Sequence, residues 1–398
     1  MNFENNIHVY RKSTIKVKGE TIGHFLKMFL YIIAIFIILL TNGCATQQRA
    51  KKKLDKKGVV YSRQNFIDAV KNGNIKNVKL FIKAGAARFI PLILDGNFLD
   101  VPINCALSNG HKRIARILIS KGVDINMEDG NGLSPLVYSL DKGYKGIARK
   151  LISKGVNINA KDINGPIPLL YAVEKGYKGV ARQLISKGAS VNPIINKGQL
   201  PLGLSLYNGN CTITKLLISK GADVNAKDNG SFEFTPIVYA SASGCKKITN
   251  LLINKGADVN AKDGFGNTPL HNALFNYKAE HGQKEIIIME LLISKGADIN
   301  AKNNTGDSPL LCALCKRYKE VVYLLVNKGA DVNTKNMKEW TALHQAVENG
   351  EKDIAELLIS KGADANKKDI GGHTPLHYAW SRGFTEIANM LIEKGGKE

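Results

Sequence analysis

The segment "LISKGADVNAKD" at residues 217–228 decides the fold, because the chain repeats it with small changes. It returns as "LINKGADVNAKD" at 252–263, "LISKGADINAKN" at 292–303, "LVNKGADVNTKN" at 325–336 and "LISKGADANKKD" at 358–369. Its glycine occurs at 85, 122, 155, 188, 221, 256, 296, 329, 362 and 395, and six of the nine intervals are 33 residues. A fixed period of this length predicts a stack of similar units, whereas the length of 398 residues alone would suggest two or three globular domains.

A second repeated segment follows most of these glycines and has the pattern of a helix start. It reads "TPLHNAL" at 268–274, "TALHQAV" at 341–347 and "TPLHYAW" at 374–380. Thr268 is a good helix cap, and Pro269 suits the first helical position, where its missing N–H costs nothing. The segment "KDIAELLISKG" at 352–362 then has apolar residues at helical spacing and ends in a lysine and a glycine stop. Each unit therefore predicts two helices followed by a hairpin-like loop.

With both segments in register, the chain resembles an ankyrin-repeat protein over residues 63–398. The resemblance implies an all-α solenoid of about ten stacked repeats, each a helix–turn–helix with a β-hairpin loop. It also implies a non-enzymatic scaffold for protein–protein interaction. The first copy, 66–87, lacks the Thr-Pro segment and is expected to act as an N-terminal cap. Residues 229–236 lengthen one hairpin, and 275–293 add seven residues between two helices, as either a tolerated surface loop or a contact loop.

Proteins similar to this chain bind partners on the concave surface formed by hairpin tips and first helices. Apolar or unusual residues at those positions are therefore the candidates for partner contact, since aromatic anchors dominate interface energetics. The alternative for each is packing against the adjacent hairpin. The candidates are Leu133, Ile163, Phe265, Met337, Trp340, Ile370 and His373 at the tips, Phe234 on the lengthened hairpin, and Tyr207 and Phe275 near the ends of first helices. Trp340 is the strongest of them, because it replaces the usual polar residue before "TALH".

The residues that could carry chemistry have structural explanations. The resemblance assigns His271, His344 and His377 to hydrogen bonds between adjacent loops, and no Gly-x-x-x-x-Gly-Lys-Ser/Thr phosphate loop occurs. The Cys312-x-x-Cys315 pair lacks a second pair that could complete a zinc site, and six irregularly spaced cysteines are not a disulfide framework. We expect no cofactor, no metal and no enzyme; an enzyme that uses these two cysteines is the third alternative.

The net charge of +22 favours anionic partners, so a basic solenoid that binds nucleic acid or another polyanionic surface is the alternative function. Nine lysines, however, precede the repeated glycines and serve as helix-end charges. We therefore expect a monomer with an unidentified protein partner. A continuous basic groove on the concave surface would favour the alternative.

The N-terminal segment, residues 1–43, determines the cellular location of the repeats. An apolar core at 28–40 is short for a membrane span and suits an export signal, and "LLTNGC" at 39–44 resembles a bacterial lipoprotein signal. The resemblance implies cleavage before Cys44 and lipid attachment to it, in a bacterial cell envelope. The alternative is an uncleaved single-pass anchor with cytoplasmic repeats, which the basic residues after Cys44 favour. The expected segments are thus a signal or anchor at 1–43, a basic tether at 44–62 and the repeat domain at 63–398.

Overall fold

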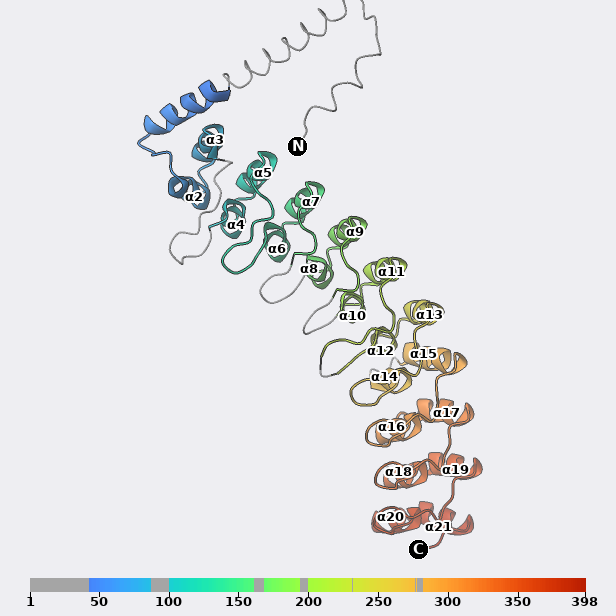
Figure 1. Ribbon diagram of the computed structural model, residues 1–398. Coiled ribbons are helices and arrows are strands. Elements are labelled where there is room, and N and C mark those ends of the chain that lie inside the picture. Colours follow the sequence, from blue (N-terminus) through green and yellow to red (C-terminus); the bar gives the residue numbers. More distant parts are fainter. Residues whose placement is uncertain are drawn as a thin grey trace, which may run out of the picture. The chain divides into compact units, whose positions relative to one another are not determined.

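The computed structural model describes residues 43–86, 100–160, 168–193, 200–230, 232–275, 277 and 282–398. Within these residues the chain forms short helices in successive pairs, joined by turns and loops and without β-strands (Figure 1). The chain divides into two compact units, residues 1–130 and 131–398. Ten helix pairs are present among the described residues, which confirms the predicted number of repeats, although the loops are irregular turns.

Unit 1 contains the first two pairs and a preceding helical segment. Residues 43–55 are helical, and Ala50 and Leu54 are buried although this segment lies in the predicted basic tether. Tyr61 stacks on Phe81 with ring centroids 5.9 Å apart. The two pairs are α2 (Arg63–Lys71) with α3 (Ile75–Lys83), and α4 (Pro102–Ser108) with α5 (Lys112–Ser120). The first copy therefore keeps both helices without the Thr-Pro segment.

Unit 2 contains the other eight pairs, and each first helix contacts the first helix of the next pair. The pairs are α6 (Pro135–Asp141) with α7 (Lys145–Ser153), α8 (Pro168–Glu174) with α9 (Lys178–Ser186), α10 (Pro201–Tyr207) with α11 (Cys211–Ser219), α12 (Pro236–Ala242) with α13 (Lys246–Asn254), α14 (Pro269–Phe275) with α15 (Gln283–Ser294), α16 (Pro309–Cys315) with α17 (Lys319–Asn327), α18 (Ala342–Glu348) with α19 (Lys352–Ser360), and α20 (Pro375–Ser381) with α21 (Thr385–Glu393).

The first helices begin as the sequence predicts. Ser308 is the N-cap of α16, where its hydroxyl accepts a hydrogen bond from the backbone N–H of Leu311, and proline follows it at the first helical position. The second helices end as predicted too: each of the nine lysines before a repeated glycine is the exposed C-cap residue of its helix.

The core runs along the stack. Leu270 and Ala273 of α14 are fully buried, as are Leu252 of α13 and Leu292 of α15. Small and branched apolar side chains at these positions let adjacent helices pack closely, which removes apolar surface from water at about 25 cal/mol per Å². In a repeat protein each repeat packs mainly on the repeats next to it. The free energy of unfolding is therefore approximately the sum of the stabilities of the single repeats and of the interfaces between neighbouring repeats.

The repeated asparagine of the loop segment ties each repeat to the next. Asn333 donates from Nδ2 to the carbonyl of Gly362 at 2.8 Å and accepts at Oδ1 from the N–H of Asp364 at 2.9 Å. Asn225 repeats both contacts with Gly256 and Asp258. The asparagine is repeated because its carboxamide satisfies one donor and one acceptor of the following loop.

The loops also approach each other closely at their tips. Gly306 has a φ of 76°, and a Cβ at this position would lie 2.9 Å from the backbone nitrogen of Met337 in the next loop. Both the left-handed conformation and the contact require glycine. Gly155, with a φ of 82°, has no such neighbour.

The seven-residue insertion changes α15, which has twelve residues where the other second helices have nine. Tyr277 of the insertion is buried, its ring centroid lies 4.7 Å from that of Tyr318, and its hydroxyl donates to Glu320 at 2.9 Å. The described end of the insertion is therefore anchored on the following repeat.

Candidate functional site

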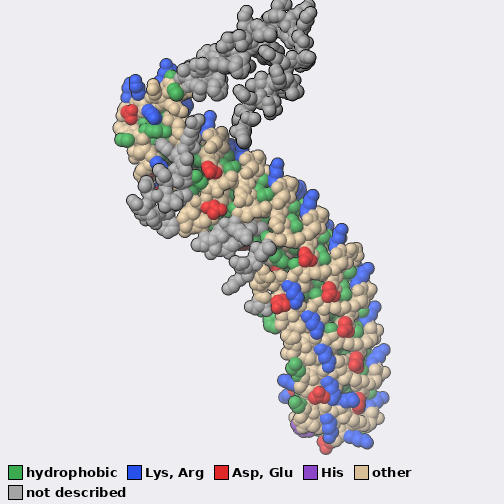
Figure 2. Space-filling view, in the orientation of Figure 1, with side chains coloured by type: hydrophobic (Ala, Val, Ile, Leu, Met, Phe, Trp, Pro, Cys, Tyr) green, Lys and Arg blue, Asp and Glu red, His purple; other side chains and the backbone are tan. Residues whose placement is uncertain are grey.

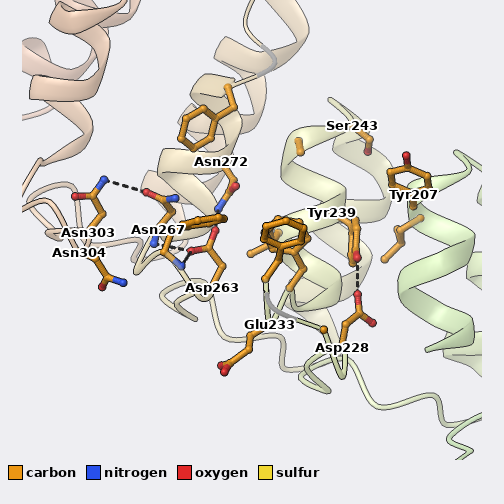
Figure 3. A pocket seen from close by; sticks show the side chains of 18 of the residues that line it. Tyr207, Asp228, Glu233, Tyr239, Ser243, Asp263, Asn267, Asn272, Asn303 and Asn304 are labelled. Carbon is orange, nitrogen blue, oxygen red and sulfur yellow. Dashed lines mark hydrogen bonds between the residues drawn. The ribbon is translucent and has the colours of Figure 1, made fainter. Parts of the chain in front are cut away.

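Four of the ten residues predicted for partner contact come together in unit 2. Tyr207, Phe234, Phe265 and Phe275 line one cavity of about 980 Å³ between the first helices and hairpin loops of successive repeats (Figure 3). They come from four different segments: the end of α10, the lengthened hairpin, the next hairpin tip and the end of α14. We call this cavity, with Phe232 described below, the aromatic groove.

The rings form a continuous row along the groove. Phe232 lies 5.4 Å from Phe265 and stacks on Phe234 at 5.5 Å, measured between ring centroids. Phe234 meets Tyr239 edge-on at 5.4 Å, and Tyr239 meets Tyr207 edge-on at 6.3 Å. These separations are those of favourable aromatic pairs, so each ring is held in place by its neighbours.

The groove remains open to solvent even though its rings pack together. The side chains of Phe232, Phe265 and Phe275 are 52%, 51% and 50% exposed, and Tyr207 is 70% exposed. Folding therefore leaves about half of each phenylalanine accessible. Contiguous exposed apolar surface of this kind marks interaction sites in soluble proteins.

Two buried aspartates, Asp228 and Asp263, hold side chains and loops of the groove in place by hydrogen bonds. Asp228 accepts a short hydrogen bond from the Tyr239 hydroxyl and another from the backbone N–H of Leu200 at 3.0 Å. Burial raises the pKa of Asp228 above its ordinary value, and the hydrogen bond from Tyr239 opposes that shift. This carboxylate is committed to fixing the tyrosine ring.

Asp263 supports the groove in the same way from the following repeat. Its Oδ1 accepts from the backbone N–H groups of Phe265 and Asn267 at 2.9 and 2.8 Å, and its Oδ2 accepts from Asn272 Nδ2 at 3.0 Å. The hairpin that carries Phe265 is therefore held by its own aspartate. Asn303 donates to Asn267 at 3.1 Å, which links this hairpin to the following loop (Figure 3).

Sequence reasoning did not single out Phe232, although it is in contact with both neighbouring phenylalanines. The signal was present in the lengthened hairpin, where "FEF" at 232–234 alternates aromatic and charged residues. Both phenylalanines line the groove, with Glu233 between them in a left-handed conformation (φ 47°), and Glu233 forms an ion pair with Lys227 at 2.8 Å.

The other predicted residues lie elsewhere. Met337 and Ile370 are exposed on separate hairpin tips, and His373 is exposed and stacks on His377 at 4.1 Å. Leu133 is half-buried. Ile163 lies outside the described residues, as do residues 1–42 of the leader.

Trp340 has mainly structural contacts. Its Nε1 donates to Asp369 at 3.2 Å and its ring meets Tyr378 edge-on at 5.1 Å, both in the following repeat. The side chain is half-buried. These contacts favour packing against the adjacent hairpin, which was the alternative for this residue.

Two of the three histidines expected to tie adjacent loops together, His271 and His344, do so, whereas His377 is exposed and its ring stacks on His373. His271 Nδ1 lies 2.9 Å from Thr268 Oγ1, and its Nε2 lies 3.1 Å from the carbonyl oxygen of Asp307 in the next repeat. His344 repeats this arrangement with Thr341 and the carbonyl of His373. Burial is the main cause that lowers the pKa of both His271 and His344, so both rings are kept neutral.

Other reactive groups show no assembled chemistry among the described residues. No cluster of three or more histidine, cysteine or acidic side chains in that portion of the chain could hold a metal ion. Burial raises the pKa of Cys312 to about 12, which keeps this thiol protonated and a poor nucleophile.

The basic residues are spread over unit 2 with acidic ones between them. Figure 2 shows lysine and arginine side chains along the edge where the odd-numbered helices lie, and a second row over the hairpin loops. Two lysines of the hairpin loops, Lys262 and Lys302, each donate to a backbone carbonyl of the next loop, at 2.9 and 2.7 Å. Acidic side chains lie between the two rows, so this face is not an unbroken basic surface (Figure 2).

Comparisons with known proteins agree with the geometry. A family model described as ankyrin repeats matches residues 66–162, 155–228, 237–336 and 334–398. No curated protein matches the chain in a sequence search. Among the described residues, no helix combines the length and the apolar character that crossing a membrane requires. The repeat period, the helix pairs and the family match over most of the sequence agree, and the chain belongs to the ankyrin-repeat family.

Proposed function

We propose that this ankyrin-repeat module binds a protein partner through the aromatic groove and is held at a membrane by its N-terminus. Ankyrin repeats are protein–protein interaction modules, and the aromatic groove is the surface that we assign to the partner of this one. The observation that supports this surface is the set of three half-exposed phenylalanines that line one groove, whose loops and tyrosine are held by buried aspartates. Rigid aromatic side chains provide large contact areas at little entropic cost.

The chemistry of the groove favours a peptide segment with apolar side chains. Phenyl rings line it, and the carboxamides of the half-buried Asn303 and the exposed Asn304 lie at its rim, whereas those of Asn267 and Asn272 are buried. Carboxamides both donate and accept hydrogen bonds, as a peptide backbone does. A partner segment can thus place apolar side chains on the rings and its backbone along the rim.

The expected affinity of the groove follows from its exposure. Full burial of a phenylalanine stabilises by up to about 3 kcal/mol, so burial of the remaining half of Phe232 or Phe265 contributes about 1 kcal/mol each. The double variant F232A/F265A should therefore weaken binding by about 2 kcal/mol, or about 30-fold. Unequal burial in the complex would change the division between the two rings, not the direction.

The test uses a displayed library of random peptides selected on the full chain. We expect the selected peptides to share aromatic or aliphatic residues, to bind in 0.5 M salt, and to lose affinity with F232A/F265A. The matched control is M337A/I370A, which removes two exposed apolar side chains outside the groove and should leave affinity unchanged. Acidic peptides that dissociate in high salt, or equal effects of both variants, would overturn the proposal and favour the polyanion alternative.

Membrane attachment at Cys44 is a separate element of the proposal. It rests on the resemblance of residues 39–44 to a lipoprotein signal and on the exposed thiol of Cys44. The basic residues that follow would add about 1 kcal/mol per charge to binding of anionic lipid. Mass spectrometry of the mature N-terminus tests it: a diacylglyceryl group on Cys44 is expected, and an uncleaved leader would contradict cleavage and lipid attachment.

A further inference from the structure

Two free thiols from consecutive repeats lie next to each other in unit 2. Cys211 is the first residue of α11 and Cys245 is the N-cap residue of α13, and their sulfur atoms are 3.8 Å apart. A disulfide requires about 2.05 Å between the sulfur atoms. Rotation about the Cα–Cβ bonds and a small adjustment of the two helix ends can close the remaining distance.

The other described cysteines lack such a partner arrangement. Cys105 is buried beside Asp100, and burial keeps the Cys312 thiol protonated. Cys315 donates instead to Gln345 Oε1 at 3.3 Å. The close pairing is thus specific to Cys211 and Cys245.

The pair is also open to a reagent. Cys211 is exposed and Cys245 is half-buried. Each thiol lies at the N-terminus of a nine-residue helix. Burial and the neighbouring thiol raise the pKa of Cys211, so its reaction becomes faster as the pH rises.

We infer that Cys211 and Cys245 form a disulfide between the fifth and sixth repeats. The oxidant is a disulfide compound. A thiolate of the pair attacks one of its sulfur atoms, which forms a mixed disulfide and releases one thiolate from the oxidant. The second cysteine thiolate then attacks the protein sulfur of that mixed disulfide, closes the Cys211–Cys245 bond and releases the second thiolate. Two protein thiols are oxidised, the oxidant is reduced to two thiols, and the protons of the protein thiols pass to solvent or to the released thiolates.

The disulfide would restrict the movement of the helices that line one end of the groove. Leu206 and Tyr207 of α10 and Val238 and Tyr239 of α12 line the groove, and α10 and α12 belong to the same two repeats as the cysteines. A covalent link between α11 and α13 therefore fixes the spacing of the two helix pairs that form one end of the groove. The inference itself does not depend on the proposed binding function, because the bond is read directly.

The test equilibrates the full chain with oxidised and reduced glutathione, blocks the remaining thiols with N-ethylmaleimide, and maps unreduced peptides by mass spectrometry. We expect a Cys211–Cys245 cross-linked peptide, about 2 Da lighter than the two free peptides together. C211S and C245S should each lack the cross-linked peptide, and the remaining cysteine of the pair should be glutathionylated or alkylated. The control C312S/C315S should keep the cross-linked peptide.

Amide hydrogen exchange gives an independent measurement. Oxidation should slow exchange in α11 and α13 of the wild-type chain several-fold, and it should have no such effect in C211S. Glutathione adducts on both cysteines without the cross-linked peptide would overturn the inference. So would a cross-link that forms only in denaturant, because the folded geometry would then not bring the thiols together.

Discussion

Lowering the pH should loosen the repeats that contain buried histidine and leave their histidine-free counterparts unaffected. The folded chain keeps His271 and His344 neutral, because burial lowers the pKa of both imidazoles. The unfolded chain takes up a proton on each ring as the pH falls through about 6.5. Since the unfolded state then binds more protons, stability is present above pH 6.5 and falls as the pH decreases toward the lowered folded pKa.

The size of the effect has an upper limit. A ring that stays neutral in the folded state loses at most about 1.4 kcal/mol per pH unit below the unfolded pKa. Between pH 7.5 and pH 5.0 this amounts to at most about 2 kcal/mol for each histidine, or about a 30-fold change in a local opening constant. The full loss requires complete burial, and both side chains are 0% exposed.

The assay is hydrogen exchange resolved by peptide, because long repeat arrays do not unfold in one cooperative step. Protection corrected for the intrinsic exchange rate should fall up to about 30-fold in α14 and α18 between pH 7.5 and 5.0. Helix α6 is the internal control, since it has Val137 where α14 has His271.

The matched variant is His271→Val, which gives α14 the residue that α6 carries. It should lower the protection of α14 at pH 7.5, through loss of two hydrogen bonds, and remove the pH dependence of that helix. Equal loss of protection in α6 and α14 on acidification, or an unchanged pH dependence in His271→Val, would refute the reasoning.

Three further substitutions test the contacts between repeats. Asn333→Ala removes two hydrogen bonds to the next loop and should cost about 1–2 kcal/mol, measured as hydrogen-exchange protection of the last two repeats. Trp340→Ala should lower the stability of these repeats by about 2–3 kcal/mol in the same measurement, because the ring packs on the following repeat. An ordinary surface substitution changes stability by about 0.5 kcal/mol or less. A loss no larger than that would show that the Trp340 ring is free to contact a partner. Gly306→Ala should lower the melting temperature more than Gly155→Ala. Both substitutions strain a left-handed backbone by about 1–2 kcal/mol, but only a Cβ at position 306 would meet the backbone of the neighbouring loop. Equal decreases in melting temperature would contradict this close approach.

Most of the fold could be predicted from the sequence, because the same pattern of helix starts, apolar positions and helix ends occurs in ten successive repeats. The nine helix-end lysines and the contacts of His271 and His344 were predicted correctly, since each depends on a local helix or on one neighbouring loop. The clustering of Tyr207, Phe265 and Phe275 could not be predicted, because it depends on how an inserted hairpin fills the space between repeats. Phe232 was missed although "FEF" at 232–234 marks this hairpin as aromatic.

Two other features depended on distances between repeats that no single repeat contains. Trp340 was predicted as the strongest candidate for partner contact, and in the structure it is half-buried with its ring edge-on to Tyr378 of the following repeat. Cys211 and Cys245 occupy positions one residue apart within their repeats, so the spacing of the cysteines gave no sign of a pair. Only the stacking of α11 beside α13 brings their sulfur atoms to 3.8 Å.

Site-specific photo-crosslinking in the native cell tests the aromatic groove most directly. A benzophenone amino acid replaces Phe232 or Phe265 in the groove, and Met337 or Ile370 in the controls, which are apolar side chains on other loops and more exposed than the two phenylalanines. We predict a discrete protein adduct at 232 and 265 that a peptide selected on the groove displaces, and no such adduct at 337 or 370. Adducts confined to 337 and 370, or an adduct at 232 and 265 that the peptide does not displace, would contradict the assignment of the groove as the binding surface.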